Sequence, residues 1–423
     1  MVNISSWDWD IGKKQITDID AWKDTFSWIE EPYVSPDGEK IAAVVKTEDM
    51  EFSVCVNGTA WESGFDKIWY LRFGPDNRLT AMVSDTGEWT VAVDGATWEN
   101  RFDYVWNTQF SPDGSNIIVA VQKGGKYFVA SNDTPWETGY SSMTNMALSH
   151  DGNHVAAVVQ TVPFSEADIF TYKKGCYTAA VDGKAWEKNF VNVWKMDFSH
   201  DGSQVAAEVR TTLYDYTIAV NGDCWDTTYP CVWQPKFSPK DDSVTAPVKA
   251  AGGWMLAQDG KPVWDRKFTQ LWHHMYSPDG ERLAAIVAPK FGRWTIAVDG
   301  NPWSLTFSDL VSDAVFSPDG KRVACIGKDG GKYTIAVDGT AWSGGCDMVW
   351  QPVFSPDGRH VAAKVEKDGA FQILVDGKPF KESYRAVWDP AFSPDSDKLL
   401  IRGIETASET GVYCRQVLSV ADV

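Results

Sequence analysis

The chain has 423 residues, of which 43% are hydrophobic and 22 are tryptophan, and its formal net charge is −19 from 58 acidic and 39 basic residues. A chain this long and apolar can bury a large core, which excludes a disordered polymer, and no run of about 18 apolar residues is present that could span a bilayer. The negative charge repels phosphate backbones and anionic lipids, so nucleic acid is not an expected ligand, and basic proteins or cations are the expected electrostatic partners.

Residues 1–14 are predicted to form a polar N-terminal arm. The first ten residues lack both the basic region and the apolar stretch of a secretory signal, which predicts a cytoplasmic protein. The sequence Trp-Asp-Trp-Asp places Trp7 and Trp9 on this arm, where an exposed aromatic pair would suit docking to a partner. The alternative is that the arm packs against the rim of the main domain.

From Ser35 onward the chain is built from one repeat, which residues 15–423 are predicted to use ten times. Its anchor is Ser-Pro-Asp-Gly, intact at Ser35, Ser111, Ser277, Ser317 and Ser355 and altered at Gly74, Ser149, Ser199, Ser238 and Ser393. Successive anchors lie 37 to 40 residues apart, except for a spacing of 50 between Ser149 and Ser199. About 15 to 17 residues after each anchor, an aromatic residue begins a β-rich stretch that ends in Asp-Gly or Asn-Gly.

Each repeat is predicted to form four short antiparallel strands, which we name a, b, c and d. Strand a enters the anchor turn, strand b leaves it, strand c ends at Asp-Gly, and strand d carries an aromatic residue three positions after that Gly. Asp-Gly supplies the positive φ values of tight hairpins, and Pro ends strand a at the anchor. Four antiparallel strands in about 39 residues are typical of a β-propeller blade.

The fourth repeat contains an insertion at 161–174, in the connection between strands b and c. It places Phe164, Ile169, Phe170 and Tyr172 in one segment that ends in two lysines, and all four side chains are expected to be exposed. Long loops on a repeat scaffold often carry function, so these residues are candidates for partner contact. The alternative is a loop folded over the mouth of the central channel.

The tenth repeat ends before its d strand, whereas the segment from Gln15 to Trp22 resembles a detached d strand. This N-terminal strand is predicted to complete the last blade and leave no free sheet edge. The fold class is therefore all-β: a single propeller of about ten four-stranded blades closed by an N-terminal strand. Two stacked five-bladed rings, or fewer blades with extra hairpins, are the alternatives.

Three repeated positions account for 19 of the 22 tryptophans. They lie five residues before an anchor, at the start of strand c, or in strand d, where they are predicted to fill the space between neighbouring sheets. Only Trp7, Trp9 and Trp28 fall outside this scheme, which makes them candidate partner-binding residues.

The sequence carries little that predicts catalysis. The seven cysteines are scattered, with no C-x-x-C or haem-attachment motif, and are predicted to be buried thiols. The six histidines lie in anchor turns or strands, and adjacent His273 and His274 would point to opposite faces of a strand. Nucleophile-elbow, zincin and phosphate-loop motifs are absent. No catalytic residue, metal or cofactor is predicted, and the repeated Asp residues are predicted to be turn residues that make one face acidic.

The aromatic residue before Ser-Pro-Asp-Gly resembles the WD40-like repeats of TolB-type propellers. That resemblance covers nearly the whole chain and is specific for fold, not for function. A tryptophan-rich propeller of this size also resembles the tryptophan-rich subunit (TmcD) of the Tmc transmembrane redox complexes of sulfate-reducing bacteria. This second resemblance implies a non-catalytic scaffold on the cytoplasmic side of the inner membrane.

The Tmc resemblance also implies the partners: a membrane cytochrome b, an iron–sulfur protein and a periplasmic multihaem cytochrome c that together carry electrons in sulfate respiration. The chain would then be peripheral and would have no membrane span of its own. The alternatives are a propeller enzyme or small-molecule sensor that uses the central channel, and a TolB-like accessory protein. Strand a offers mostly Trp, Pro, Gln, Lys and Val before the anchors, which disfavours the channel enzyme.

Overall fold

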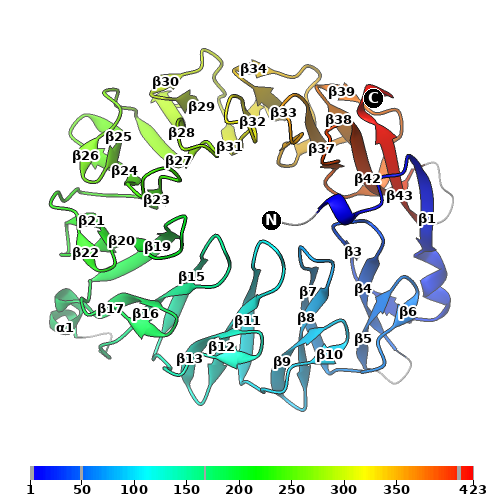
Figure 1. Ribbon diagram of the computed structural model, residues 1–423, viewed down its shortest axis with the longest axis horizontal. Coiled ribbons are helices and arrows are strands. Elements are labelled where there is room, and N and C mark those ends of the chain that lie inside the picture. The colour runs from blue at the N-terminus through cyan, green and yellow to red at the C-terminus, as the bar shows by residue number, and fades with distance from the viewer. Residues whose placement is uncertain (1–3, 48–50, 166–167, 407–410, 423) are drawn as a thin grey trace. The chain divides into compact units, whose positions relative to one another are not determined.

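The computed structural model describes residues 4–47, 51–165, 168–406 and 411–422. The chain divides into two compact units, residues 1–101 with 303–423 (unit 1) and residues 102–302 (unit 2). Within each unit, antiparallel sheets stand side by side in chain order (Figure 1). The predicted all-β, propeller-like architecture of repeated four-stranded sheets is confirmed.

Unit 1 contains the first, second, eighth, ninth and tenth repeats. The first three of these form the strands β2 (Trp28–Ile29), β3 (Tyr33–Val34), β4 (Ile41–Lys46), β5 (Phe52–Val56) and β6 (Thr59–Ala60); β7 (Lys67–Phe73), β8 (Leu79–Asp85), β9 (Glu88–Val93) and β10 (Ala96–Thr97); and β31 (Leu310–Phe316), β32 (Val323–Asp329), β33 (Lys332–Val337) and β34 (Thr340–Ala341). The ninth and tenth repeats share one sheet of β35 (Met348–Val349), β36 (Val353–Phe354), β37 (Val361–Lys367), β38 (Ala370–Val375), β39 (Lys378–Pro379), β40 (Tyr384–Val387), β41 (Ala391–Phe392), β42 (Lys398–Glu405), β43 (Val412–Ser419) and β1 (Gly12–Asp18). Short 3-10 turns cover Ile4–Ser6, Asp20–Asp24 and Val420–Asp422.

Unit 2 contains the third to seventh repeats, one sheet each. Their strands are β11 (Tyr104–Phe110), β12 (Ile117–Lys123), β13 (Lys126–Ser131) and β14 (Thr134–Pro135); β15 (Met143–Leu148), β16 (Val155–Gln160), β17 (Tyr177–Val181) and β18 (Lys184–Ala185); β19 (Asn192–Phe198), β20 (Val205–Arg210), β21 (Tyr216–Val220) and β22 (Asp223–Cys224); β23 (Lys236–Phe237), β24 (Val244–Ala250), β25 (Gly253–Gln258) and β26 (Lys261–Pro262); and β27 (Gln270–Tyr276), β28 (Leu283–Lys290), β29 (Arg293–Val298) and β30 (Asn301–Pro302). The helix α1 (Ile169–Lys174) lies between β16 and β17.

The anchor turn is held by its serine. In the eighth repeat, the Ser317 hydroxyl donates to Asp319 Oδ1 at 2.6 Å and accepts the backbone N–H of Arg322 at 3.0 Å. Ser317 is fully buried, as are the serines of the other intact anchors. The same pair of bonds recurs in the first, third, fourth, fifth, seventh and ninth repeats. Hydrogen bonds from Ser199 and Ser203 lower the pKa of Asp201 to about 2, so this aspartate serves the turn as a carboxylate.

The Asp-Gly turn fastens strand c to the start of strand b. Asp338 Oδ1 accepts the backbone N–H of Val323 at 2.9 Å, and Oδ2 accepts Arg322 Nε at 2.9 Å. Asn57, Asn132 and Asn221 accept the equivalent N–H in their own repeats. Because Asn performs the same function as Asp, the bond depends on the side-chain oxygen and not on charge. Much of the acidic excess is therefore turn chemistry, as predicted.

The tryptophans of strand d pack against the Asp-Gly turn of the following repeat. A Cβ atom added to Gly377 would lie 3.1 Å from Cγ of Trp342, and one added to Gly95 would lie 3.2 Å from Cγ of Trp61. The same contact joins Trp136 to Gly183, Trp186 to Gly222, Trp225 to Gly260, Trp264 to Gly300 and Trp303 to Gly339. The expected wedging of tryptophan between neighbouring sheets is therefore found at these junctions, and glycine is needed there for both positive φ and space.

A second set of aromatic contacts lies within each sheet. The tryptophan five residues before the anchor packs against the aromatic residue that begins strand c, as in Trp69 with Trp89 at 4.6 Å and Trp233 with Trp254 at 5.5 Å between ring centroids. The other pairs are Trp106–Tyr127, Trp194–Tyr216, Trp272–Trp294, Trp350–Phe371 and Trp388–Tyr413. In these pairs, side chains of strands a and c meet across strand b.

Unit 1 joins the last repeat to the first. Strand β1 pairs antiparallel with β43, which confirms the predicted N-terminal strand. The strand covers Gly12–Asp18 rather than Gln15 to Trp22, because Asp18 accepts the backbone N–H of Asp20 and the chain turns into a 3-10 segment that holds buried Trp22. Next to this strand, Tyr413 OH donates to the Gly38 carbonyl at 3.0 Å, and Arg402 Nη1 donates to the Ser35 carbonyl at 3.0 Å.

The cysteines and histidines occupy structural positions in the described residues. Five of the seven cysteines are buried and two are half-buried, and all are free thiols. His274 is buried with Nε2 3.2 Å from the Thr245 carbonyl oxygen, whereas His273 is exposed at a strand bulge. Across the same residues, no group of three or more His, Cys, Asp or Glu is arranged to hold a metal, and no helix has the length and apolarity to cross a membrane.

Candidate protein-interaction surface

The N-terminal arm folds back on itself. Trp9 Nε1 donates to the Ile4 carbonyl at 2.8 Å, and the rings of Trp7 and Trp9 stack with centroids 6.0 Å apart. Arg415 in β43 donates to the Asp8 carbonyl, which ties the arm to the last sheet. Both indoles are half-buried, so the arm packs on unit 1 while part of each ring remains accessible.

Trp28 joins the aromatic pairs of the fold, although its sequence position differs from theirs. Its ring meets Phe52 edge-on at 5.9 Å, and Phe52 is the residue that begins strand c of the first repeat. Trp28 lies opposite Lys46 in β4, two positions earlier along strand a than the slot tryptophans. Its ring is 43% exposed, close to the 45% of Trp69, so Trp28 resembles the architectural tryptophans in both packing and exposure.

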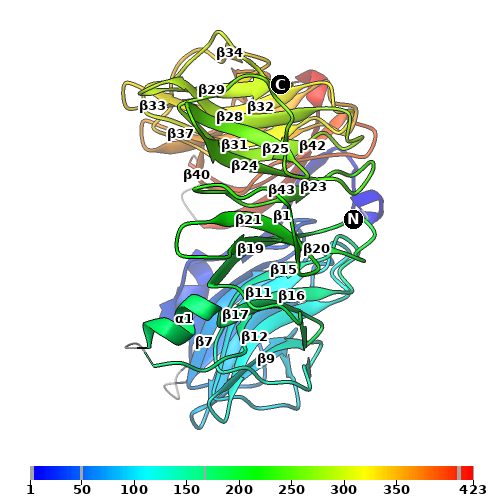
Figure 2. The ribbon, with the colours of Figure 1, turned by 90° about the vertical axis from the view of Figure 1, so that its left-hand side faces the viewer.

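The insertion of the fourth repeat forms a short helix where a loop was expected. Asp168 caps α1 by accepting the Thr171 backbone N–H at 3.0 Å, and Lys173 and Lys174 lie at its C-terminal end, where the helix dipole favours cations. Figure 2 shows α1 projecting from one edge of unit 2.

The aromatic residues of the insertion divide into two kinds. Tyr172 donates to Asn192 Oδ1 at 2.5 Å in the next repeat, and Phe164 contacts both Tyr172 and Tyr177. Phe164 and Tyr172 are therefore half-buried, contrary to the expectation that all four apolar residues are exposed. Ile169 and Phe170 point away from the sheet, with 45% and 77% of their surface exposed. The contacts of Phe164 and Tyr172 fix α1 and hold Phe170 outward.

Two further exposed aromatic residues, missed from the sequence, lie in the same kind of connection. Tyr214 is 80% exposed between β20 and β21, and Phe291 is 92% exposed at the tip of the β28–β29 hairpin. With Phe170, they are the three most exposed large hydrophobic side chains of the described chain. We call Phe170, Tyr214 and Phe291 the rim aromatics.

The rim aromatics share one end of the sheets of unit 2. All three lie in connections between strands b and c, opposite to the anchor and Asp-Gly turns. The loops that carry them are ordered by local bonds: Thr212 Oγ1 donates to Asp215 Oδ2 at 2.6 Å below Tyr214, and Gly292 with φ +69° closes the hairpin of Phe291. Rigid aromatic side chains lose little entropy on binding and often carry the binding energy of protein interfaces.

Comparison with known proteins gives no family for this chain. We found no matching family model, and no curated protein sequence is similar to this chain. Among solved structures, the Dos1 propeller is similar at 13% identity and a TM-score of 0.35, covering 96% of this chain and 95% of that one. The TolB of Acinetobacter baumannii is similar at 14% identity and a TM-score of 0.29, covering 74% of this chain and 78% of that one. A putative TolB from Agrobacterium tumefaciens is similar at 20% identity and a TM-score of 0.26, covering 48% of this chain and 81% of that one.

Proposed function

We propose that this protein is a non-catalytic scaffold that binds other proteins through the rim aromatics. The observation that carries the proposal is that the three most exposed aromatic side chains of the described residues all lie on b–c connections of unit 2. Apolar side chains of this size are costly to leave in water and are typical of binding surfaces. Lys173, Lys174 and Lys290 lie beside them in sequence, so the matching surface on a partner is apolar with acidic residues around it.

The finer proposal names the assembly. The tryptophan-rich repeat resembles the TmcD subunit of the Tmc redox complexes, and on that resemblance we propose a membrane-associated electron-transfer complex as the setting. Its partners would be a membrane cytochrome b, an iron–sulfur protein and a multihaem cytochrome c. The chain would hold these subunits from the cytoplasmic side and would itself bind no cofactor.

Affinity purification from native membranes, followed by mass spectrometry, tests both the scaffold proposal and the redox-complex proposal. The wild-type chain is expected to bring down the cytochrome and iron–sulfur subunits. A variant with Phe170→Ser, Tyr214→Ser and Phe291→Ser is expected to lose them while keeping its melting temperature, because these side chains are exposed. The matched control is Tyr33→Ser, Tyr70→Ser and Met348→Ser, which removes exposed apolar side chains from unit 1.

The outcomes separate the two levels of the proposal. If other proteins co-purify and depend on the rim aromatics, the scaffold stands and the redox assignment fails. If both triple variants retain the partners equally, the rim aromatics are not the binding surface.

A further inference from the structure

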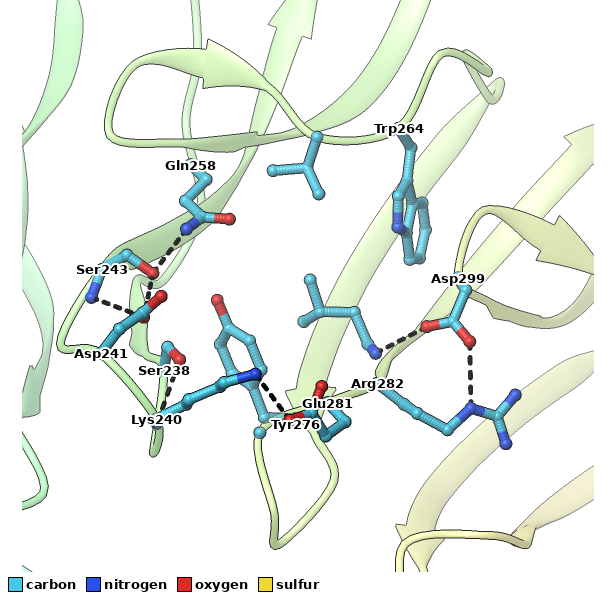
Figure 3. A pocket seen from close by; sticks show the side chains of 13 residues that line it. Ser238, Lys240, Asp241, Ser243, Gln258, Trp264, Tyr276, Glu281, Arg282 and Asp299 are labelled. Atoms are coloured by element: carbon cyan, nitrogen blue, oxygen red, sulfur yellow. Dashed lines mark hydrogen bonds and ion pairs between the residues drawn. The ribbon is translucent and has the colours of Figure 1, made fainter.

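A cavity of about 500 Å³ opens between the sixth and seventh repeats of unit 2 (Figure 3). It lies at the anchor-turn end of the sheets, opposite to the rim aromatics. One wall comes from the sixth repeat and contains Ser238, Lys240, Asp241, Ser243, Gln258, Val263 and Trp264. The other wall comes from the seventh repeat and contains Tyr276, Gly280, Glu281, Arg282, Leu283 and Asp299. The volume is within the range of small-molecule sites.

The side chain that bridges some neighbouring repeats is short at this boundary. Five residues after the anchor serine, three other repeats carry a long polar side chain that reaches the anchor turn of the next repeat. Lys40 Nζ donates to the Asn77 carbonyl at 3.3 Å, Asn116 Nδ2 to Gly152 at 2.9 Å, and Arg322 Nη1 to Gly358 at 3.2 Å. The sixth repeat has Ser243 at this position, which is too short to cross the gap.

Two more departures from the repeat place polar groups in the same gap. Gln258 occupies the position before the Asp-Gly turn, where seven other repeats have Val: Val56, Val93, Val181, Val220, Val298, Val337 and Val375. Tyr276 occupies the position before the anchor, where the other repeats have Val34, Phe73, Phe110, Leu148, Phe198, Phe237, Phe316, Phe354 and Phe392. Three positions thus differ from the other repeats where the sixth and seventh repeats meet. Ser243 is a small residue at the bridging position, and Gln258 and Tyr276 are polar residues at positions that are usually apolar.

The polar groups of the cavity suit hydroxyl groups. The hydroxyl oxygen of Tyr276 is buried beside the side chains of Thr245 and Ser243, and it points into the cavity in Figure 3. Gln258 Nε2 donates to Ser243 Oγ at 2.5 Å, and its carbonyl oxygen faces the same space. Asp241 Oδ1 accepts the Ser243 hydroxyl at 2.7 Å. A ligand here must therefore both donate and accept hydrogen bonds.

The charges of the cavity disfavour an anion. Lys240 Nζ pairs with Glu281 Oε1 at 2.6 Å, and Arg282 Nε pairs with Asp299 Oδ2 at 3.0 Å. With these two cations matched by two carboxylates, Asp241 leaves the lining with one extra negative charge. Val263 and Leu283 provide an apolar side, and Trp264 turns the indole nitrogen toward the cavity.

We propose that this cavity binds a neutral polyhydroxylated small molecule of mono- or disaccharide size. Its hydroxyl groups form hydrogen bonds with Tyr276, Gln258 and Asp241, and its C–H groups lie against Val263 and Leu283. The site is separate from the rim aromatics, so it neither requires nor tests the scaffold function.

Binding of D-glucose and trehalose to the full chain, measured by saturation-transfer NMR and calorimetry, tests the proposal, with glucose 6-phosphate as the charged comparison. Saturable binding of at least one neutral sugar is expected, and Ser243→Arg should abolish it by filling the gap as arginine does in the eighth repeat. The same change in the third repeat, Asn116→Arg, is the matched control and should leave binding unchanged. Tyr276→Phe keeps the ring and should weaken binding about tenfold, the loss of one hydrogen bond.

Arg282 and Arg322 already occupy the equivalent position, so Ser243→Arg is compatible with the fold, and an unchanged melting temperature verifies this. The proposal is overturned if neither neutral sugar binds saturably. It is also overturned if glucose 6-phosphate binds more tightly than glucose, or if Ser243→Arg binds as well as the wild type.

Discussion

Replacing Asp338 by alanine should destabilise unit 1 far more than replacing it by asparagine. Asp338 Oδ1 accepts the backbone N–H of Val323 at 2.9 Å, its Oδ2 pairs with Arg322 at 2.9 Å, and its own φ is +50°. Alanine removes both bonds and leaves the N–H of buried Val323 without a partner. Asparagine keeps the oxygen that accepts this N–H, and Asn57, Asn132 and Asn221 already hold the equivalent turn elsewhere.

The magnitude follows from these contacts. An unsatisfied buried N–H costs about 1–3 kcal/mol, and alanine in the left-handed region costs about 1–2 kcal/mol. The ion pair with Arg322 contributes at most about 1 kcal/mol, because the two side chains are 35% and 46% exposed and solvent screens them. Asp338→Ala should therefore cost about 2–6 kcal/mol, and Asp338→Asn about 1 kcal/mol or less.

Scanning calorimetry and urea unfolding measure the difference. For a unit of about 200 residues, each kcal/mol lowers the melting temperature by about 2–4 °C, so the alanine variant should melt roughly 4–20 °C below the asparagine variant. If the two variants melted together, the ion pair rather than the backbone hydrogen bond would hold the turn. If neither variant melted lower than the wild type, the turn would contribute nothing to stability.

Three other changes probe separate parts of the structure. Trp22→Ala should lower the free energy of unfolding by about 3–5 kcal/mol, because Trp22 is buried beside β1, whereas Trp7→Ala on the half-buried arm should cost much less in the same urea titration. Burial raises the pKa of Glu208 to about 7 from 4.5, so the folded protein holds this proton where the unfolded chain loses it. Stability should therefore fall as pH rises between those two values and then level off, and Glu208→Gln should remove that fall from the melting curves; an unchanged pH profile would contradict it. Burial raises the pKa of the Cys325 thiol to about 12. Iodoacetamide should therefore modify half-buried Cys224 before Cys325. Mass spectrometry that showed Cys325 labelled earlier would refute this order.

The repeat and its strands could be predicted because their signals are local. Ser-Pro-Asp-Gly and Asp-Gly specify turn geometry through a few neighbouring atoms, as the bonds of Ser317, Asp319 and Asp338 illustrate. The position of Trp22 could not be predicted in this way. A d strand and a 3-10 turn both place an aromatic residue near Gly58, and the choice depends on the hydrogen bond from Asp20 to Asp18.

The candidate surface was predicted only in part, since exposure depends on what a side chain meets. Ile169 and Phe170 are exposed as expected, but Phe164 and Tyr172 contact Tyr177 and Asn192, which lie in neighbouring strands. The sequence did contain a signal for Phe291. Other repeats place Thr86, Ala251 or Asp368 before the glycine of this hairpin, so an aromatic residue there has no turn function.

A comparison of equivalent positions among the repeats shows how the sixth repeat differs from the others. Its anchor reads Ser238-Pro-Lys-Asp, and its turn closes differently: Ser238 Oγ accepts the Lys240 N–H at 3.2 Å, Asp241 accepts that of Ser243 at 3.2 Å, and the positive φ lies one residue later, at Asp242. Ser243 bonds Asp241 within this altered turn, but the turn does not require Gln258 or Tyr276, which lie outside it, to change as well. Their convergence becomes visible only once the end of strand c in one repeat is known to face the anchor of the next. A repeat protein thus contains its own controls, and positions outside the turns that depart together from the repeat are where a binding function should be sought.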